Sequence, residues 1–105
     1  MIVADTFKAL GDPVRLRLFY LLSLSGELCV CRFTDALSLP QSTVSRHLAV
    51  LRHAGLVDTR RDGKWIYYRL AGDTAQALAT LIRDQANDAQ RTDAERLAVA
   101  VNDCG

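Results

Sequence analysis

The chain has few of the features on which secretion, membrane insertion and most catalysis depend. Among its 105 residues there are two histidines and three cysteines, and no apolar run approaches the ~20 residues that cross a bilayer. No charged start followed by an apolar stretch and a cleavage site is present, so we expect a cytoplasmic protein with no membrane partner. Catalysis needs a nucleophile beside a base or paired acids, and neither is evident, so we do not expect an enzyme.

Charge is nearly balanced overall, at +1, but it is unevenly distributed along the chain. Residues 41–70 carry six basic and two acidic side chains, whereas residues 71–105 carry three basic and six acidic ones. A basic block of this kind is typical of a surface that faces a polyanion such as DNA. On charge alone, an ordinary solvated face explains the block equally well.

Helix signals divide the first quarter of the chain into two segments. Apolar residues three apart predict a short helix over residues 5–10. Asp12 and Pro13 are typical of the N-cap and the first position of a second helix. That helix is expected to run to about Ser25, because Gly26 is a common helix terminator.

A break that contains a proline separates two further segments. Residues 27–37 predict either a short helix or a strand followed by a helix. Residues 41–54 predict an amphipathic helix, because Val44, Leu48 and Leu51 recur at helical spacing and so face a core. The two segments together predict a helix-turn-helix whose second helix is the recognition helix.

The hydrophobic period changes after this helix. Residues 56–70 are rich in β-branched and aromatic side chains around Asp62-Gly63, which predicts a hairpin with a two-residue loop. Residues 73–105 are again helical in pattern, with a second short helix expected from about Asp93 to Val101. The order predicts one mainly helical (α+β) domain over residues 1–105, a winged helix-turn-helix whose wing is the hairpin.

Short polar side chains at the start of the predicted recognition helix suit the major groove of DNA. Glutamine can bridge adenine, arginine can bridge guanine, and serine or threonine can bind bases or phosphates. Cations around the hairpin turn suit backbone phosphates or a minor groove. A solvated helix and a charged edge strand that prevents aggregation are the alternative interpretations. The predicted DNA-binding residues are Gln41, Ser42, Thr43, Ser45, Arg46, His47, Arg60, Arg61 and Lys64.

The cysteines are Cys29, Cys31 and Cys104. An odd number of cysteines in a short intracellular chain argues against a disulfide framework. Reduced thiols are ligands for soft metal ions. The alternative is that they pack as small apolar side chains.

Five segments together resemble the ArsR/SmtB family of metal-responsive repressors. They are Val14–Leu18, Glu27–Cys31, Gln41–Leu48, Leu51–Val57 and Gly63–Tyr68, within a resemblance that covers about residues 5–85. The resemblance implies a homodimer joined by its first and last helices, the latter within residues 73–105. It also implies binding to double-stranded operator DNA and repression that an inducer relieves.

Within that family, Glu27–Cys31 resembles the arsenic and antimony sensors, which implies As(III) or Sb(III) as inducer, derepression of resistance genes and no required cofactor. Those sensors carry a third cysteine at the position of Thr34. We therefore expect Cys104, from the same chain or the other one, to be the third ligand beside Cys29 and Cys31, with small-molecule thiols as the alternative. Zinc and nickel sites of other branches use histidines in the C-terminal helix, and residues 73–105 contain none.

The spacing of Cys29 and Cys31 constrains how they can share an ion. Residues i and i+2 of a helix lie ~200° apart around its axis, whereas in an extended segment they lie on one side with Cα atoms ~6.5 Å apart. We expect binding to hold the segment extended or to unwind the helix start, and so to shift the recognition helix relative to its partner in the dimer. Cadmium or lead at the same thiols, a redox response and a DNA-binding module without ligand remain the alternatives.

Overall fold

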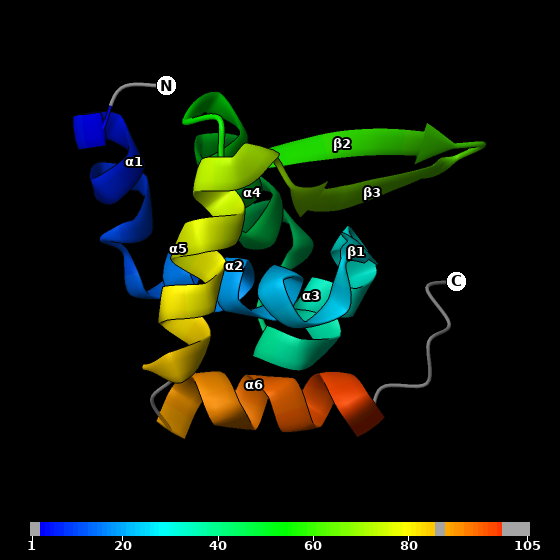
Figure 1. The fold of residues 1–105 in the computed structure, drawn as a ribbon. Coiled ribbons are helices and arrows are strands. Elements are labelled where there is room, and N and C mark those ends of the chain that lie inside the picture. The colour runs from blue at the N-terminus through cyan, green and yellow to red at the C-terminus, as the bar shows by residue number, and fades with distance from the viewer. Residues whose placement is uncertain (1–2, 86–87, 100–105) are drawn as a thin grey trace.

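The computed structural model describes residues 3–85 and 88–99, and these fold into helices around a small sheet (Figure 1). Within these ranges no helix is long and apolar enough to cross a bilayer. In chain order the elements are α1 (Val3–Leu10), α2 (Pro13–Ser25), β1 (Glu27–Cys29), α3 (Val30–Leu37), α4 (Gln41–His53), β2 (Val57–Asp62), β3 (Trp65–Leu70), α5 (Gly72–Asp84) and α6 (Asp88–Val99).

The predicted start and end of α2 are confirmed by their hydrogen bonds and backbone angles. The Asp12 carboxylate accepts from the amides of Val14 and Arg15, at 2.8 and 3.2 Å, and Pro13 occupies the first turn. Gly26 ends the helix with a φ of 80°, a conformation that favours glycine. α2 is thereby fixed as the central helix, and the largest buried side chains on it are Leu18, Phe19, Leu21 and Leu22.

The predicted helix-turn-helix is formed by α3 and α4. Ser38 makes the turn in the left-handed region, with a φ of 56°, and its amide donates to the Thr34 carbonyl oxygen at 2.9 Å. α4 then packs on the body through Val44, Leu48 and Leu51, which are fully buried. The helix therefore presents its opposite side, and the polar start of its sequence, to solvent.

Residues 27–37 form a strand followed by a helix, one of the two predicted arrangements, and the strand joins the wing. The sheet has the antiparallel order β1-β3-β2. The hairpin loop is one residue later than predicted: Asp62 pairs with Trp65, so the loop is Gly63-Lys64 rather than Asp62-Gly63. Gly63 occupies the first loop position with a φ of 62°, which a hairpin turn of this length requires.

The last helix begins earlier than predicted, and it packs on its own chain. α6 begins at Asp88 rather than near Asp93, and Val101 lies outside the described residues. Asp93 is fully buried and accepts from the Arg17 Nε and Nη2 atoms at 2.6 and 2.8 Å. Together with the buried Leu97, this ion pair holds α6 against α2 and α3 of its own chain (Figure 1). The buried side of α6 therefore packs within one chain, and the dimer contact expected within residues 73–105 stays a prediction.

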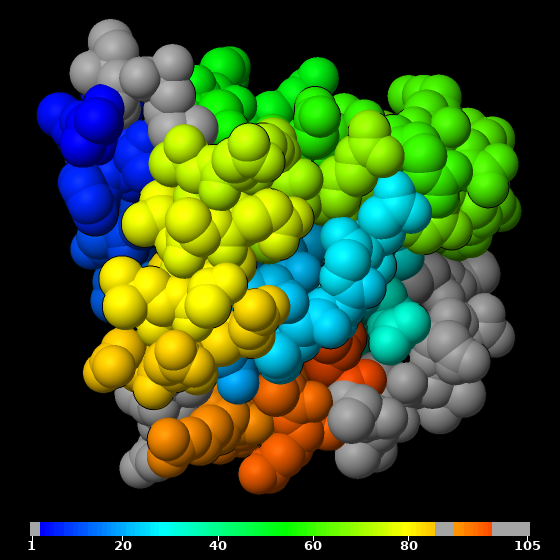
Figure 2. Space-filling model, viewed as in Figure 1, coloured from blue at the N-terminus to red at the C-terminus, as the bar shows by residue number. Residues whose placement is uncertain are grey.

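α5 and α6 are both in view on one face of the molecule (Figure 2), and the β2–β3 hairpin extends sideways from the helices (Figure 1). Large apolar side chains remain exposed on α1 and α5, where Phe7 is 60% exposed and Leu81 is 58% exposed. Exposed apolar side chains that form a contiguous patch are typical of a surface that binds another protein chain.

Candidate nucleic-acid interface and cysteine site

The start of α4 presents most of the predicted DNA-binding side chains to solvent. Gln41, Ser42 and Arg46 are exposed, and Thr43 and Ser45 are partly exposed. The buried stripe of α4 leaves these side chains on the outward side of a firmly packed helix. Their hydrogen-bonding groups are therefore positioned to meet base edges or phosphates in a groove.

His47 is turned toward the body rather than toward the outward side. Its Nδ1 atom lies 3.3 Å from the Arg15 Nη1 atom, and Arg15 also donates from Nε to the Ala9 carbonyl oxygen at 2.6 Å. Burial lowers the pKa of His47, and the positive charges of Arg15 and Arg46 act in the same direction. The ring is thus neutral near pH 7, and this contact assigns Nδ1 as acceptor. Sequence reasoning missed Arg15, because its partner lies 32 residues away.

The three predicted DNA-binding cations of the wing differ in the contacts that they make. Arg61 and Lys64 are exposed near the turn, where the Lys64 Nζ atom lies 5.1 Å from the centre of the Trp65 ring. Arg60 instead forms a two-point ion pair with Glu27 of β1, with Nε–Oε2 and Nη2–Oε1 distances of 2.9 and 2.8 Å. The arrangement leaves Arg61 and Lys64 as the wing cations most available to DNA.

Glu27 is a residue to which the sequence assigned no role of its own. The hydrogen bond from Arg60 lowers the pKa of the Glu27 carboxyl group, so it is ionised at neutral pH. Arg69 adds a second, longer ion pair at 3.9 Å. No local signal predicts this arrangement, because the Arg60 side chain comes from 33 residues further along the chain.

Cys29 and Cys31, the cysteine pair from here on, meet where β1 ends and α3 begins. Cys29 is extended, with φ and ψ of −84° and 163°, and Cys31 lies in the first turn of α3. Their Sγ atoms are 3.0 Å apart. Two thiolates on one ion, each bound at about 2.3 Å, lie at most about 4.6 Å from each other. The junction therefore brings the sulfurs within sharing distance, and unwinding of the helix start is not needed for this.

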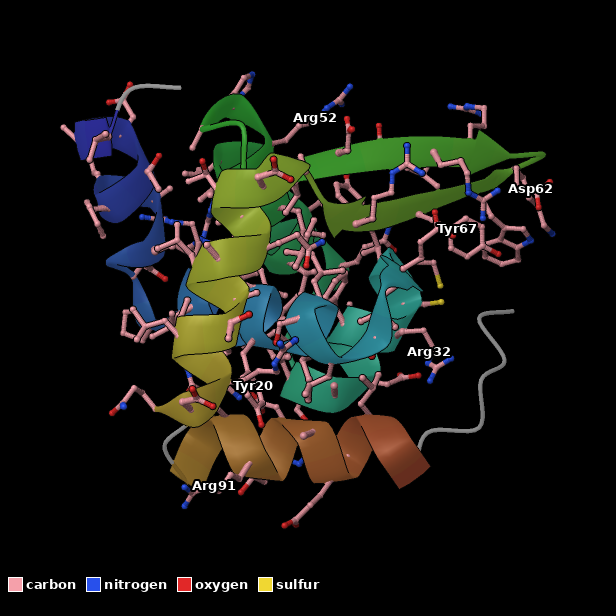
Figure 3. The ribbon with its side chains drawn as sticks, in the orientation of Figure 1. Tyr20, Arg32, Arg52, Asp62, Tyr67 and Arg91 are labelled. Atoms are coloured by element: carbon pink, nitrogen blue, oxygen red, sulfur yellow. The ribbon has the colours of Figure 1, made fainter. Side chains whose placement is uncertain are left out.

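No third ligand is clustered with the cysteine pair among the described residues of the single chain. They contain no group of three or more Cys, His, Asp or Glu side chains that could hold a metal ion. The Thr34 hydroxyl group, at the position of the family's third cysteine, donates to the Cys31 carbonyl oxygen at 2.8 Å. Cys104 lies outside the described residues, so its predicted role stays a prediction. Tyr67, labelled in Figure 3, is the residue that pairs with Cys29 in the sheet.

Comparison with known proteins identifies the chain. A family model described as "Bacterial regulatory protein, arsR family" matches residues 12–59. The arsenical resistance operon repressor of Escherichia coli is 42% identical over 95 residues, which cover 90% of this chain and 78% of that protein. The chain belongs to the ArsR family. This ArsR-family protein is a DNA-binding transcriptional repressor and not an enzyme, as the sequence predicted.

Other relatives of this ArsR-family protein confirm its fold and show the breadth of the family. The solved homodimeric winged helix-turn-helix DNA-binding domain of Mb0332 from Mycobacterium bovis matches with a TM-score of 0.72 and 36% identity, over 79% of this chain and 76% of that one. A cadmium resistance regulatory protein homolog from Staphylococcus aureus is 41% identical over 78 residues, or 74% of this chain and 64% of that protein. Membership of the family therefore does not select the inducer.

Proposed function

We propose that this repressor binds operator DNA as a cytoplasmic homodimer and leaves it when As(III) or Sb(III) binds the cysteine pair, which derepresses resistance genes. The observation that carries the proposal is the 3.0 Å distance between the Cys29 and Cys31 sulfurs at the β1–α3 junction. Thiolates are the ligands that soft ions prefer, and a close pair presents two of them to one ion at once. No other cofactor is required.

Cys104 of the same chain is the third ligand in this proposal. A cavity of about 480 Å³ beside β1 is lined by Leu28 and Arg32, next to the cysteine pair in sequence, and by Leu97 of α6. α6 ends at Val99, and the five residues from there to Cys104 can span up to about 18 Å when extended. The proposal takes this short connection as the route by which Cys104 approaches the pair. Cys104 of the partner subunit and a small-molecule thiol are the other sources that the experiment below separates.

The dimer contact is proposed to involve α1 and α5. Val3, Phe7 and Leu81 are large apolar side chains on these helices, and each is more than half exposed in the single chain. Burial of such surface against a second copy is favourable in proportion to the area removed from water. The homodimeric relative from Mycobacterium bovis supports this assembly. α1 is the first helix and α5 lies almost entirely within residues 73–105, so both belong to the regions expected to form the dimer contact.

Arsenite titration of single Cys→Ser variants on operator DNA tests the inducer site. The operator is one selected from random duplexes, and the reductant is a thiol-free phosphine. We expect wild-type protein to be released, and Cys29→Ser and Cys31→Ser proteins to bind DNA normally but stay bound. Ser25→Ala, an exposed change in the last residue of α2, is the matched control and should respond as wild type. Full release of both cysteine variants contradicts the proposal.

X-ray absorption of the arsenite-loaded protein identifies the third ligand. We expect three sulfur neighbours in wild type and two in Cys104→Ser. Mixed dimers then show which chain supplies Cys104. One chain carries Cys104→Ser and the other carries Cys29→Ser with Cys31→Ser. A complete three-sulfur site forms in such a dimer only if Cys104 acts across subunits. Three sulfurs in Cys104→Ser protein after added glutathione identify a small-molecule thiol.

A redox response is the second candidate, and the same 3.0 Å separation favours it. Peroxide can oxidise two adjacent thiols to a disulfide, with reduction of the peroxide to water. Release of the operator by peroxide but not by arsenite selects this candidate. Release by cadmium or lead, and not by arsenite, selects the same thiols with a different ion.

A further inference from the structure

The strand that carries Cys29 is also a strand of the wing. β1 pairs with β3, and the register places Cys29 opposite Tyr67, which in turn lies opposite Arg60 of β2. Residues directly opposite each other in antiparallel strands project to the same face of the sheet. Cys29, Tyr67 and Arg60 therefore form one row across the wing, beginning at the cysteine pair and ending at the outer strand.

A side-chain ion pair also joins two of the strands that carry this row. The Arg60 guanidinium lies 4.8 Å from the centre of the Tyr67 ring and reaches past it to the Glu27 carboxylate, with which it makes two hydrogen bonds at 2.8 and 2.9 Å. Glu27 lies two residues before Cys29 on the same face of β1. The ion pair thus joins the outer wing strand directly to the short strand that ends at the cysteine pair.

Ion binding at the cysteine pair must act on the end of β1. Cys29 is at once the last residue of β1 and the N-cap of α3, so a change in its backbone or side-chain angles alters both elements. β1 is only three residues long, and Glu27 is its first residue. Glu27 thus lies two residues from Cys29 on the same strand, and its side chain contacts the outer strand of the wing.

We propose that the wing is the element through which the cysteine pair controls DNA affinity, and that the Glu27–Arg60 ion pair couples the two. This inference rests on the proposed arsenite response and names its route. In this scheme Arg60 is a positioning residue that fixes the orientation of the hairpin. Arg61 and Lys64 are the wing cations that contact DNA. Because the Arg60 side chain is 43% exposed, the coupling weakens as salt screens the pair.

The test is the ratio of operator dissociation constants with and without arsenite, measured for wild type and Glu27→Gln. Allosteric coupling typically changes affinity by about 5–150-fold. We expect Glu27→Gln to reduce the ratio at least about fivefold, and the affinity for DNA without arsenite is measured in the same titration. Arsenite binding, measured separately by equilibrium dialysis, should be unchanged. Glu95→Gln removes an exposed carboxylate from α6 and is the matched control.

Each outcome of this test decides between the two proposals. An unchanged ratio in Glu27→Gln overturns the coupling route and leaves the arsenite response intact. Loss of arsenite binding in the variant also overturns the route, because Glu27 then acts on the thiol site itself. If arsenite leaves the operator dissociation constant of the wild-type protein unchanged, both the proposed function and the coupling are overturned.

A second measurement on the wild-type chain needs no variant. Arsenite should change the backbone amide exchange of residues 57–70 by at least about threefold in rate, since the wing is expected to move relative to β1. The exchange of the buried stripe of α4 should change less. Unaltered exchange across residues 57–70 in protein that has bound arsenite overturns the proposal.

Discussion

The two elements proposed to touch DNA are attached to the rest of the molecule by different forces. α4 is held by Val44, Leu48 and Leu51, which are fully buried. The base of the wing packs on the core through the buried Val57, but beyond its base the wing is held by pairing with a three-residue strand and by the exposed Glu27–Arg60 ion pair. Close apolar packing resists displacement and is little affected by salt, whereas an exposed ion pair is weak and screened. The wing is therefore the part that a ligand or a change of salt moves more easily.

The largest expected effect tests the apolar attachment of α4. Leu48→Ala should lower the free energy of unfolding by about 2–5 kcal/mol, because a fully buried leucine leaves a cavity. Val50→Ala, on the exposed side of the same helix, is the control and should stay within about 0.5 kcal/mol of wild type. Urea unfolding followed by circular dichroism measures both. Equal losses in the two variants would contradict a core-anchored α4.

An intermediate effect distinguishes the two elements by their salt response. Arg61→Ala should weaken binding to all DNA sequences similarly and lower the slope of log K against log salt by about 0.9, as expected for one lost phosphate contact. Gln41→Ala should leave that slope nearly unchanged and alter the base preference instead. Titrations of labelled operator and unrelated DNA over a range of salt concentrations give both quantities. A wild-type slope in Arg61→Ala protein would remove Arg61 from the interface.

The smallest expected effect is the contribution of His47, on α4, to the pH dependence of the free energy of unfolding. Burial lowers the pKa of His47, aided by Arg15 and Arg46 and opposed by Asp12. In the unfolded chain the pKa is about 6.5, so on acidification the unfolded state binds this proton first. The contribution of neutral His47 to stability is therefore complete above about pH 6.5 and is lost as pH falls through the lower folded value.

The measurement is the melting temperature between about pH 7 and pH 5. It should fall more steeply for wild type than for His47→Gln, which has no such proton to bind. His53→Gln changes the other, exposed histidine of α4 and should follow the wild-type curve. Identical curves for wild type and His47→Gln would show that His47 does not contribute.

Features that depend on neighbouring residues were predictable from the sequence. The Asp12 cap acts over three residues, and Gly26 ends its helix by its own backbone angle. The hairpin was placed correctly to within one residue, but its register was not, because Asp62-Gly63 and Gly63-Lys64 are both acceptable two-residue loops. The pairing of Asp62 with Trp65, set by the rest of the sheet, decides between them.

Features that join distant parts of the chain were not predictable. Arg60 and Glu27 are 33 residues apart, and Arg17 and Asp93 are 76 apart. No periodicity or local motif pairs one charge with another over such distances. The cysteine pair was predictable only in part. The spacing of the two cysteines indicated which residues form the site, but the short distance between their sulfur atoms depends on the change from strand to helix between them.

Trp65 is the only tryptophan in the chain, and it lies beside the wing turn under the Lys64 ammonium group. Its indole fluorescence therefore originates entirely from the hairpin, with no background from the core. The unmodified protein carries its own optical reporter at the place where displacement is expected. A simple emission titration can follow the hairpin in real time without any attached dye.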